Sequence, residues 1–173
     1  EALGLAMIIE LPLVVINVQR GGPSTGLPTK TEQSDLLQSL YGRNGESPVI
    51  VIAASTPANC FDFAYEAAKL TIEHMTPVIL LSDGYIASGS APWKIKSVAD
   101  MPEIKNNIIK EANENWHTYD RDENTLARKW PIPGTKGLEH RVGGLEKDRI
   151  TGNVSYIADN HEYMTKIRAE KIK

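Results

Sequence analysis

The sequence predicts an α/β fold built on an open, mostly parallel sheet with helices on both faces. Three short apolar runs, at residues 13–18, 49–54 and 78–82, are continuous rather than alternating and are rich in β-branched residues. Runs of this kind are typical of strands buried on both faces of a parallel sheet. Helical stretches separate the runs, so we expect right-handed crossover connections between neighbouring strands.

The helices are predicted from apolar periodicity and from the residues that begin them. Residues 1–10 have the pattern of an amphipathic helix, residues 31–41 follow the first strand, and residues 57–75 follow the second. Beyond Ser90 only residues 103–115 and 161–173 have helical patterns. The last of these is strongly charged, and we expect it to be an exposed helix.

Composition divides the chain into two parts. The 173 residues carry a net charge of -3, but residues 1–90 hold 4 basic and 9 acidic side chains while residues 91–173 hold 15 and 13. Residues 1–90 are therefore expected to form the packed core of the domain. Residues 91–173 are expected to be a charged loop-and-helix extension, acting as a linker toward a following domain.

Several classes of protein are excluded or disfavoured by simple counts. The near-neutral charge gives no electrostatic basis for binding nucleic acid or an anionic membrane, and no apolar stretch approaches the roughly 20 residues that span a bilayer. The single cysteine, Cys60, excludes an internal disulfide and indicates a reducing, cytoplasmic location. Because the chain opens at Glu1 without an initiator methionine, we expect it to be an internal piece of a longer polypeptide.

The strongest functional signal is the loop at residues 19–33, which follows the first predicted strand. Open α/β sheets place their ligands at the carboxyl ends of such strands. Glycines there allow backbone amides to approach a ligand, and Arg20 offers a planar donor fork that suits a carboxylate or phosphate. Thr29 and Glu32 have capping-box spacing, which predicts that a helix starts beside the loop. An anion pocket is therefore expected from these loop residues: Arg20, Gly21, Gly22, Ser24, Thr25, Gly26 and Thr29. The alternative is that the glycines only shape a turn and Arg20 pairs with a surface acid.

The same loop carries a resemblance to a known family. The run Gln19-Arg-Gly-Gly-Pro-Ser-Thr-Gly-Leu-Pro-Thr-Lys-Thr-Glu-Gln33 resembles the α subunit of 2-oxoacid:ferredoxin oxidoreductases, in particular the 2-oxoglutarate type. Four further stretches are similar to the same family: residues 42–46, 76–85, 133–140 and 151–155. The resemblance implies an incomplete thiamin-diphosphate-binding fold, in which the α subunit holds the aminopyrimidine end of the cofactor.

The resemblance also implies a reaction and its participants. Family members decarboxylate a 2-oxoacid oxidatively, form an acyl-CoA with coenzyme A as co-substrate, and pass two electrons to ferredoxin. A separate β subunit binds the diphosphate, its Mg²⁺ and an iron–sulphur cluster. By position in the motif, Arg20 matches the arginine that holds the 1-carboxylate of the substrate, Thr29 matches a threonine of the substrate pocket, and Ser24 and Thr25 complete the loop wall.

The chain also departs from the family pattern. The glutamate that activates the aminopyrimidine would lie upstream, and neither Glu1 nor Glu10 is assigned that role. The polypeptide alone is therefore expected to be inactive. Two alternatives stay open: the same fold acting on pyruvate or on a branched-chain or aryl 2-oxoacid, and a non-catalytic α/β module that binds a ligand or a partner.

Other residues have weaker claims to function. Asp83, at the end of the third predicted strand, is expected to serve a turn more than a site. Residues 42–46 are a turn signal before the second strand. Residues 137–152 form either a mobile lid over the active site or a plain surface loop. Cys60 is expected to be a small buried apolar residue.

Overall fold

The computed structural model describes all 173 residues and contains a three-stranded parallel sheet. The strands are β1 (Leu13–Gln19), β2 (Ile50–Ala53) and β3 (Pro77–Asp83), arranged in the order β1-β3-β2. Leu13 pairs with Pro77 and Gln19 with Asp83, so β1 and β3 run in register over their whole lengths. These bounds confirm the three predicted strands and the α/β class.

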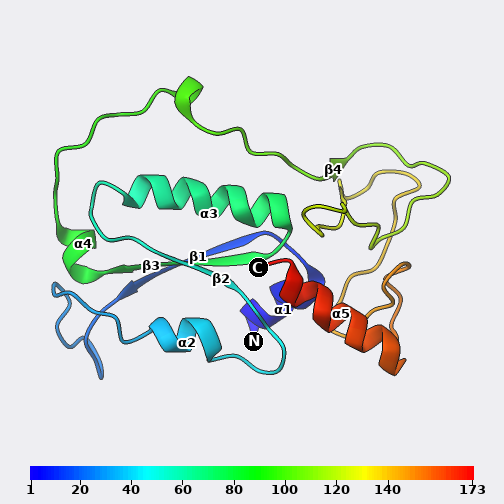
Figure 1. Cartoon of the computed structure of the whole chain (residues 1–173), viewed down its shortest axis with the longest axis horizontal. Helices are drawn as coiled ribbons and strands as arrows, with labels where there is room; N and C mark the ends of the chain where they lie inside the picture. The colour runs from blue at the N-terminus through cyan, green and yellow to red at the C-terminus, as the bar shows by residue number, and fades with distance from the viewer.

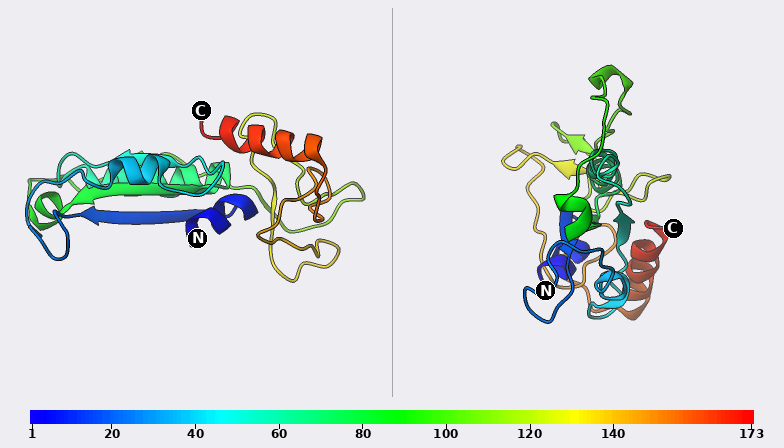
Figure 2. Two further views of the ribbon diagram at one scale, coloured as in Figure 1. Left: turned by 90° about the horizontal axis from the view of Figure 1, so that it is seen from below. Right: turned by 90° about the vertical axis from the view of Figure 1, so that its left-hand side faces the viewer.

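Helices cover both faces of the sheet, as predicted (Figure 1). Helix α3 (Cys60–His74) packs on one face and contacts all three strands. Helices α1 (Ala2–Ile9) and α2 (Leu36–Tyr41) lie on the other face, and the views in Figure 2 show the thin sheet between these layers. Both α3 and α1 match their predicted ranges closely, whereas α2 begins five residues later than expected.

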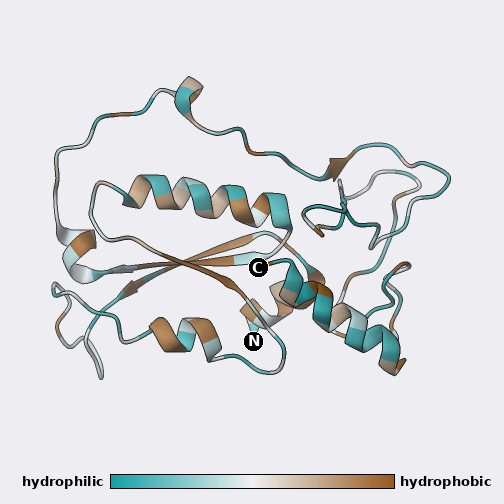
Figure 3. Ribbon diagram, in the orientation of Figure 1, coloured by the Kyte–Doolittle hydropathy of each residue, from teal (hydrophilic) through white to brown (hydrophobic).

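The core forms where alternate strand residues meet α1. Met7 of α1 packs with Val49, Ile79 and Leu81, and Val15 and Val51 lie against this cluster. Because Val15 and Val51 are both register partners of Ile79, the three side chains form one row across the sheet. The hydropathy colouring in Figure 3 shows apolar strands, and a helix α3 on which apolar and polar residues alternate. Of the three apolar runs, only the central strand β3 is buried on both faces as expected. Ile16 and Val18 of the edge strand β1 are 62% and 48% exposed, and β2 is at most half-buried.

One threonine joins α3 to the beginnings of two strands. The Thr71 hydroxyl accepts a hydrogen bond from the Leu13 amide at 2.7 Å and donates to the Thr76 carbonyl at 2.5 Å. Thr71 is 4% exposed, so these bonds are shielded from water. The amino ends of β1 and β3 are thereby fixed against the last turn of α3.

The segment that leaves the core crosses outside α3 and contradicts one predicted helix. After α4 (Gly84–Ser88) the chain is extended apart from a short 3₁₀ turn, η1 (Val98–Asp100), and residues 103–115, predicted to be helical, are not. The Asn106 and Asn113 side chains accept hydrogen bonds from the amides of Ile108 and Asn115. Such local side-chain bonds compete with helical ones and explain the error.

The last third of the chain packs beside α1 at the amino ends of the strands (Figure 1). It contains a two-stranded parallel pair, β4 (Ile108–Ile109) and β5 (Trp130–Pro131), and ends in α5 (Ala158–Glu170). The position of α5 agrees with the prediction, but its environment does not, because one stripe of the helix is buried against the rest of the chain. The buried stripe comprises Asn160, Met164, Arg168 and, after the helix end, Lys171.

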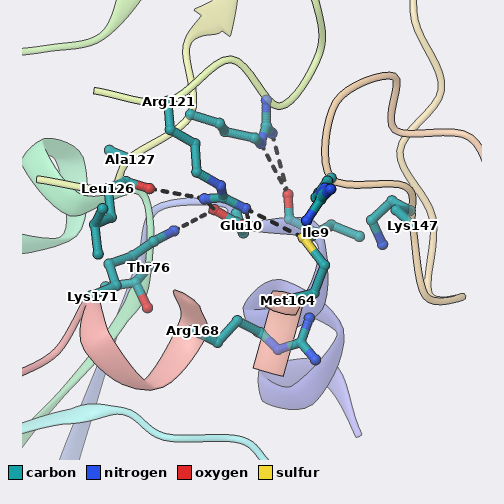
Figure 4. Close-up of polar contacts among 12 residues, drawn as sticks. Ile9, Glu10, Thr76, Arg121, Leu126, Ala127, Lys147, Met164, Arg168 and Lys171 are labelled. Carbon is teal, nitrogen blue, oxygen red and sulfur yellow. Dashed lines mark hydrogen bonds and ion pairs between the residues drawn. The ribbon is translucent and has the colours of Figure 1, made fainter. Parts of the chain in front are cut away.

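The contact between this part and the core is centred on a buried carboxylate. Glu10, 1% exposed, ends α1 in a left-handed conformation with φ of 54°. Its two oxygens accept hydrogen bonds from Arg121 at 2.5 and 2.7 Å, and it also forms an ion pair with Lys171 (Figure 4). Arg128 donates to the neighbouring Ile9 carbonyl at 3.2 and 3.3 Å. Residues 91–173 are therefore joined to the core at their far end instead of being a solvated arm throughout.

None of the helices is both long and apolar enough to cross a bilayer.

Candidate functional site

The loop that follows β1 lies at the carboxyl end of the sheet, where the sequence places the candidate site. β1 ends at Gln19 and its register partner Asp83 ends β3, so the residues after Gln19 leave the sheet directly beside the start of α4. In parallel α/β sheets this edge is where the chain leaves the strands and ligands bind. The predicted position of the site is thus reproduced by the fold.

Polar side chains from the strand ends hold the two ends of the loop together. The Gln19 side chain donates to the Ser82 carbonyl at 3.2 Å and accepts a hydrogen bond from the Asp35 amide at 3.1 Å. Asn17 donates to the Asp35 carboxylate at 3.0 Å. Because Gln19 is 5% exposed, its bonds are formed in a largely dry setting, where they are strong. The loop is therefore anchored at its exit from β1 and again at its entry into α2.

Asp83 fixes the loop a third time. One oxygen of its carboxylate accepts a hydrogen bond from the Ile86 amide at 2.8 Å, which caps α4, and the other accepts from the Glu32 amide at 3.2 Å. Asp83 therefore caps a helix from an extended backbone, which differs from the turn role expected for it. The second bond also makes Asp83 a positioning residue for the loop.

Two glycines are required by close backbone approach. A Cβ atom at Gly84 would lie 1.8 Å from the Pro28 carbonyl oxygen, so only glycine allows the loop to pass over the start of α4. Gly26 has φ of 53°, and a Cβ there would lie 1.4 Å from the Gly21 carbonyl oxygen, which accepts a hydrogen bond from the Leu27 amide at 3.0 Å. The shape of the loop is therefore set by these contacts as well as by its tethers.

The residues assigned to substrate all lie on the exposed part of this loop. Residues 22–31 are exposed, and so is Arg20, whose guanidinium has no hydrogen bond or ion pair with any other residue of the chain. The surface acid that would have explained Arg20 as a structural residue is not present. The hydroxyls of Ser24, Thr25 and Thr29 likewise make no hydrogen bond within the chain.

The expected capping box is absent. Helix α2 begins at Leu36 with Asp35 as its N-cap, and the Glu32 carboxylate instead accepts hydrogen bonds from the Gln33 and Ser34 amides, both at 2.8 Å. The short-range bonds of Glu32 close a turn and delay the helix, so Thr29 does not cap it. The Thr29 hydroxyl is left available to a ligand.

Within this chain the loop is exposed and forms an open platform. The cavity of about 510 Å³ lies elsewhere, between α1, the turn at residues 42–47 and α5. Gly144 and Glu146 of the segment 137–152 also line this cavity, and a Cβ at Gly144 would be 3.3 Å from the Leu5 side chain. Within this chain they therefore contact α1 and α5 and do not cover the Arg20 loop. The turn at 42–46 is built by Arg43, which donates to three backbone carbonyls, and so serves structure.

The chain offers no metal centre of its own. No group of three or more His, Cys, Asp or Glu side chains converges in the structure. Cys60 is a free, half-buried thiol at the start of α3, and its Sγ donates to the Thr56 carbonyl at 3.5 Å. A single thiol cannot hold an iron–sulphur cluster, which uses several cysteine ligands. The residues present therefore fit neither a metal ion nor a cluster.

Sequence reasoning missed the residues that position the loop. Gln19, Asn17 and Asp35 are polar residues in or beside a buried strand, and only the strand assignment could have singled out Asn17 and Gln19 as unusual. Buried amide side chains at the carboxyl end of a parallel strand are a usable signal, because burial requires that they be hydrogen-bonded.

The chain is similar to known proteins over most of its length. The model of the family described as pyruvate flavodoxin/ferredoxin oxidoreductase, thiamine diP-binding, matches residues 1–157. The 2-oxoglutarate oxidoreductase subunit KorA of Mycobacterium tuberculosis is 59% identical over 172 residues, covering 99% of this chain and 26% of that protein. The 2-oxoglutarate synthase subunit KorA of Methanocaldococcus jannaschii is 39% identical over 173 residues, covering 100% of this chain and 45% of that protein.

A solved structure is similar over the same extent. The 2-oxoglutarate:ferredoxin oxidoreductase from Magnetococcus marinus, with 2-oxoglutarate, coenzyme A and succinyl-CoA bound, superposes with a TM-score of 0.87 at 36% identity, covering 99% of this chain and 29% of that chain. The chain thus spans between about a quarter and a half of the length of these relatives. With its parallel sheet, its loop at the carboxyl edge and the match over residues 1–157, the chain belongs to the thiamine-diphosphate-binding family of pyruvate flavodoxin/ferredoxin oxidoreductases.

Proposed function

We propose that the chain is the part of an α subunit that presents substrate to the cofactor in a 2-oxoglutarate:ferredoxin oxidoreductase. The observation that carries the proposal is Arg20: an exposed guanidinium without an internal partner, on a loop fixed at three points to the carboxyl end of the sheet. A fixed, unpaired guanidinium is suited to holding a carboxylate through two parallel hydrogen bonds.

The role of this chain is to hold the 2-oxoacid in position. Arg20 binds the 1-carboxylate, while the Thr29, Ser24 and Thr25 hydroxyls and the amides of Gly21, Gly22 and Gly26 form the wall beside it. Thiamin diphosphate, when bound, supplies the stabilisation of the carbanion left by decarboxylation. Orientation of the leaving carboxylate is a large part of catalysis when both reactants are bound.

Because the loop is an open platform, the opposite wall of the site must come from another protein surface. We assign that wall to a β subunit, which would also bind the diphosphate with its Mg²⁺ and an iron–sulphur cluster, since this chain lacks the ligands for either. Coenzyme A would accept the acyl group and ferredoxin would take the two electrons. We place the complex in the cytoplasm, where the free Cys60 thiol is stable.

The test is substitution of Arg20 in the complete complex of both subunits. We expect Arg20→Ala to lower kcat/KM for 2-oxoglutarate by roughly 100-fold, the effect typical of removing one strong electrostatic contact to the reacting group. Arg20→Lys should recover part of the loss because it keeps the charge but not the fork. Lys94→Gln, which removes an exposed cation from the segment outside α3, is the matched control.

An unchanged kcat/KM in Arg20→Ala would refute the assignment. A panel of 2-oxoglutarate, pyruvate, a branched-chain 2-oxoacid and an aryl 2-oxoacid then separates the substrates. A complex that turns over none of them would favour a non-catalytic binding module.

A further inference from the structure

Two adjoining cavities lie in the charged part of the chain, on either side of the segment 116–121. One of about 220 Å³ is lined by Trp116, His117 and Arg141, among others, and one of about 160 Å³ by His117, Tyr119, Arg121 and Arg149. His117 belongs to both walls, so the two cavities are neighbours. We refer to them together as the Trp116–Arg121 cleft.

Three residues that line this cleft carry buried hydrogen-bonding atoms without partners. Five buried side-chain nitrogen or oxygen atoms in the chain have no hydrogen bond, and three of them are Trp116 Nε1, the Tyr119 hydroxyl and Arg121 Nε. Tyr119 is 2% exposed, and the Arg121 side chain is 8% exposed. Buried polar groups in proteins are almost always paired, so three orphans within six residues are unusual.

All three groups can act as donors. The indole and guanidinium nitrogens can only donate. Burial, and to a lesser extent the Glu10 carboxylate, raise the pKa of Tyr119, so its phenol keeps the proton. The partner that such a wall selects is rich in acceptor oxygens.

The rim of the cleft adds positive charge that is not otherwise used. The Arg149 guanidinium lies over the Tyr163 ring, 5.0 Å from its centre, and its side chain makes no hydrogen bond or ion pair. Arg141 is exposed and equally free. The two acids at the cleft are engaged, because Asp120 pairs with Lys129 at 2.9 Å and Glu139 accepts a hydrogen bond from the Gly137 amide at 2.8 Å.

We propose that the Trp116–Arg121 cleft binds the oxyanion of a small soluble ligand, either a phosphate or a carboxylate group. Arg149 and Arg141 attract the anion at the rim, and the Trp116 indole N–H, which has no partner in the chain, donates a hydrogen bond to it as it enters. The inference rests on the residues of this segment alone and is independent of the role assigned to Arg20.

The experiment uses the holoenzyme that contains this chain, with its cofactor bound, and titrates it with inorganic phosphate or with succinate. Hydrogen exchange followed by mass spectrometry reports on peptides that cover residues 116–121. We expect one of the two anions to slow exchange there in a saturable manner. Arg149→Gln should raise the half-saturating concentration of that anion by at least about tenfold, the effect of losing a hydrogen bond to a charged group.

Lys136→Gln is the matched control, because Lys136 is an exposed cation of the same region that lines neither cavity. It should leave the half-saturation unchanged. Protection by phosphate alone identifies a phosphorylated ligand, and protection by succinate alone identifies a carboxylate. The proposal is overturned if neither anion slows exchange at residues 116–121. It is also overturned if the half-saturating concentration is the same in Arg149→Gln and in the parent protein. Exchange outside the cleft verifies that the variants remain folded.

Discussion

Replacing Glu10 by Gln removes the one charge that the buried contact between core and extension depends on. Glu10 is 1% exposed and accepts two hydrogen bonds from Arg121 while also pairing with Lys171. Burial alone would raise the pKa of Glu10, but Lys171 and Arg121 outweigh it and hold that pKa well below its ordinary value. The carboxylate is therefore ionised at neutral pH, and both cations rely on it.

The size of the effect follows from what the substitution leaves behind. Lys171 is 2% exposed and Arg121 8%, so neither cation can turn to water without moving the chain that carries it. Removing one partner of a buried ion pair costs about 3–5 kcal/mol, because the other charge stays buried without compensation. At about 1.4 kcal/mol per factor of ten, the opening equilibrium of α5 should rise by roughly 100- to 4000-fold.

The assay is hydrogen exchange of the α5 amides in the complete protein. Exchange through local opening reports the free energy of that opening directly. Glu162→Gln is the matched control, since Glu162 also pairs with a lysine, Lys166, but both side chains are about two-thirds exposed. Exposed pairs contribute little, so the control should leave α5 exchange unchanged. If Glu10→Gln exchanged no faster than Glu162→Gln, the reasoning that α5 is held by a buried carboxylate would be wrong.

Two further outcomes follow from the same structure. Gly84→Ala should lower kcat/KM for the 2-oxoacid by roughly 10- to 100-fold in the complete complex, because the added Cβ would lie 1.8 Å from the Pro28 carbonyl oxygen and must displace the loop. Gly143→Ala is the control and should leave kcat/KM unchanged, since a Cβ there meets nothing within 4 Å. Equal kcat/KM values for the two variants would show that the position of the loop does not matter. Acid should also destabilise the packing of α5. Because the pKa of Glu10 is lower in the folded state than in the unfolded state, the stabilisation that Glu10 gives to α5 is complete above pH 4.5 and is lost as the pH falls further. Hydrogen exchange of the α5 amides, corrected for its intrinsic pH dependence, should therefore accelerate below pH 4.5, and should accelerate less in Glu10→Gln.

The core of the fold could be predicted because its determinants are local and apolar. The runs at 13–18, 49–54 and 78–82 need only to be continuous and flanked by helices to specify a parallel sheet, and β1, β2 and β3 lie at those positions. The helix expected at 103–115 fails for an equally local reason. Its asparagine side chains accept hydrogen bonds from nearby backbone amides, which compete with the hydrogen bonds of a helix. The spacing of apolar residues, on which the helix was predicted, contains no information about that competition.

The site loop could be located but its support could not be foreseen. The glycines and Arg20 mark the loop in sequence, whereas Gln19 and Asp83 act together only because two strands 64 residues apart are in register. That register is a tertiary property. The open, exposed state of the loop is also invisible to a pattern, since the same residues could line a closed pocket or one wall of a shared one.

Charge misled the prediction most where it was densest. A sequence with many lysines and arginines beyond Ser90 indicates a solvated arm, because cations are rarely buried unless they are paired. Here the partner is Glu10, 111 residues before Arg121 and 161 before Lys171, so no window of sequence contains the pair. The cations of the buried stripe are thus residues of a type usually found on protein surfaces that here lie in the interior. Arg20 shows the opposite arrangement: it lies near the core by sequence yet is exposed and unpaired. A cation that the fold has already neutralised, such as Lys171, is a structural residue, whereas one that the fold holds in place without a partner, such as Arg20, is free to bind a ligand. Pairing within the chain, more than the number of charges, therefore separates the structural cations from the candidate ligand-binding ones.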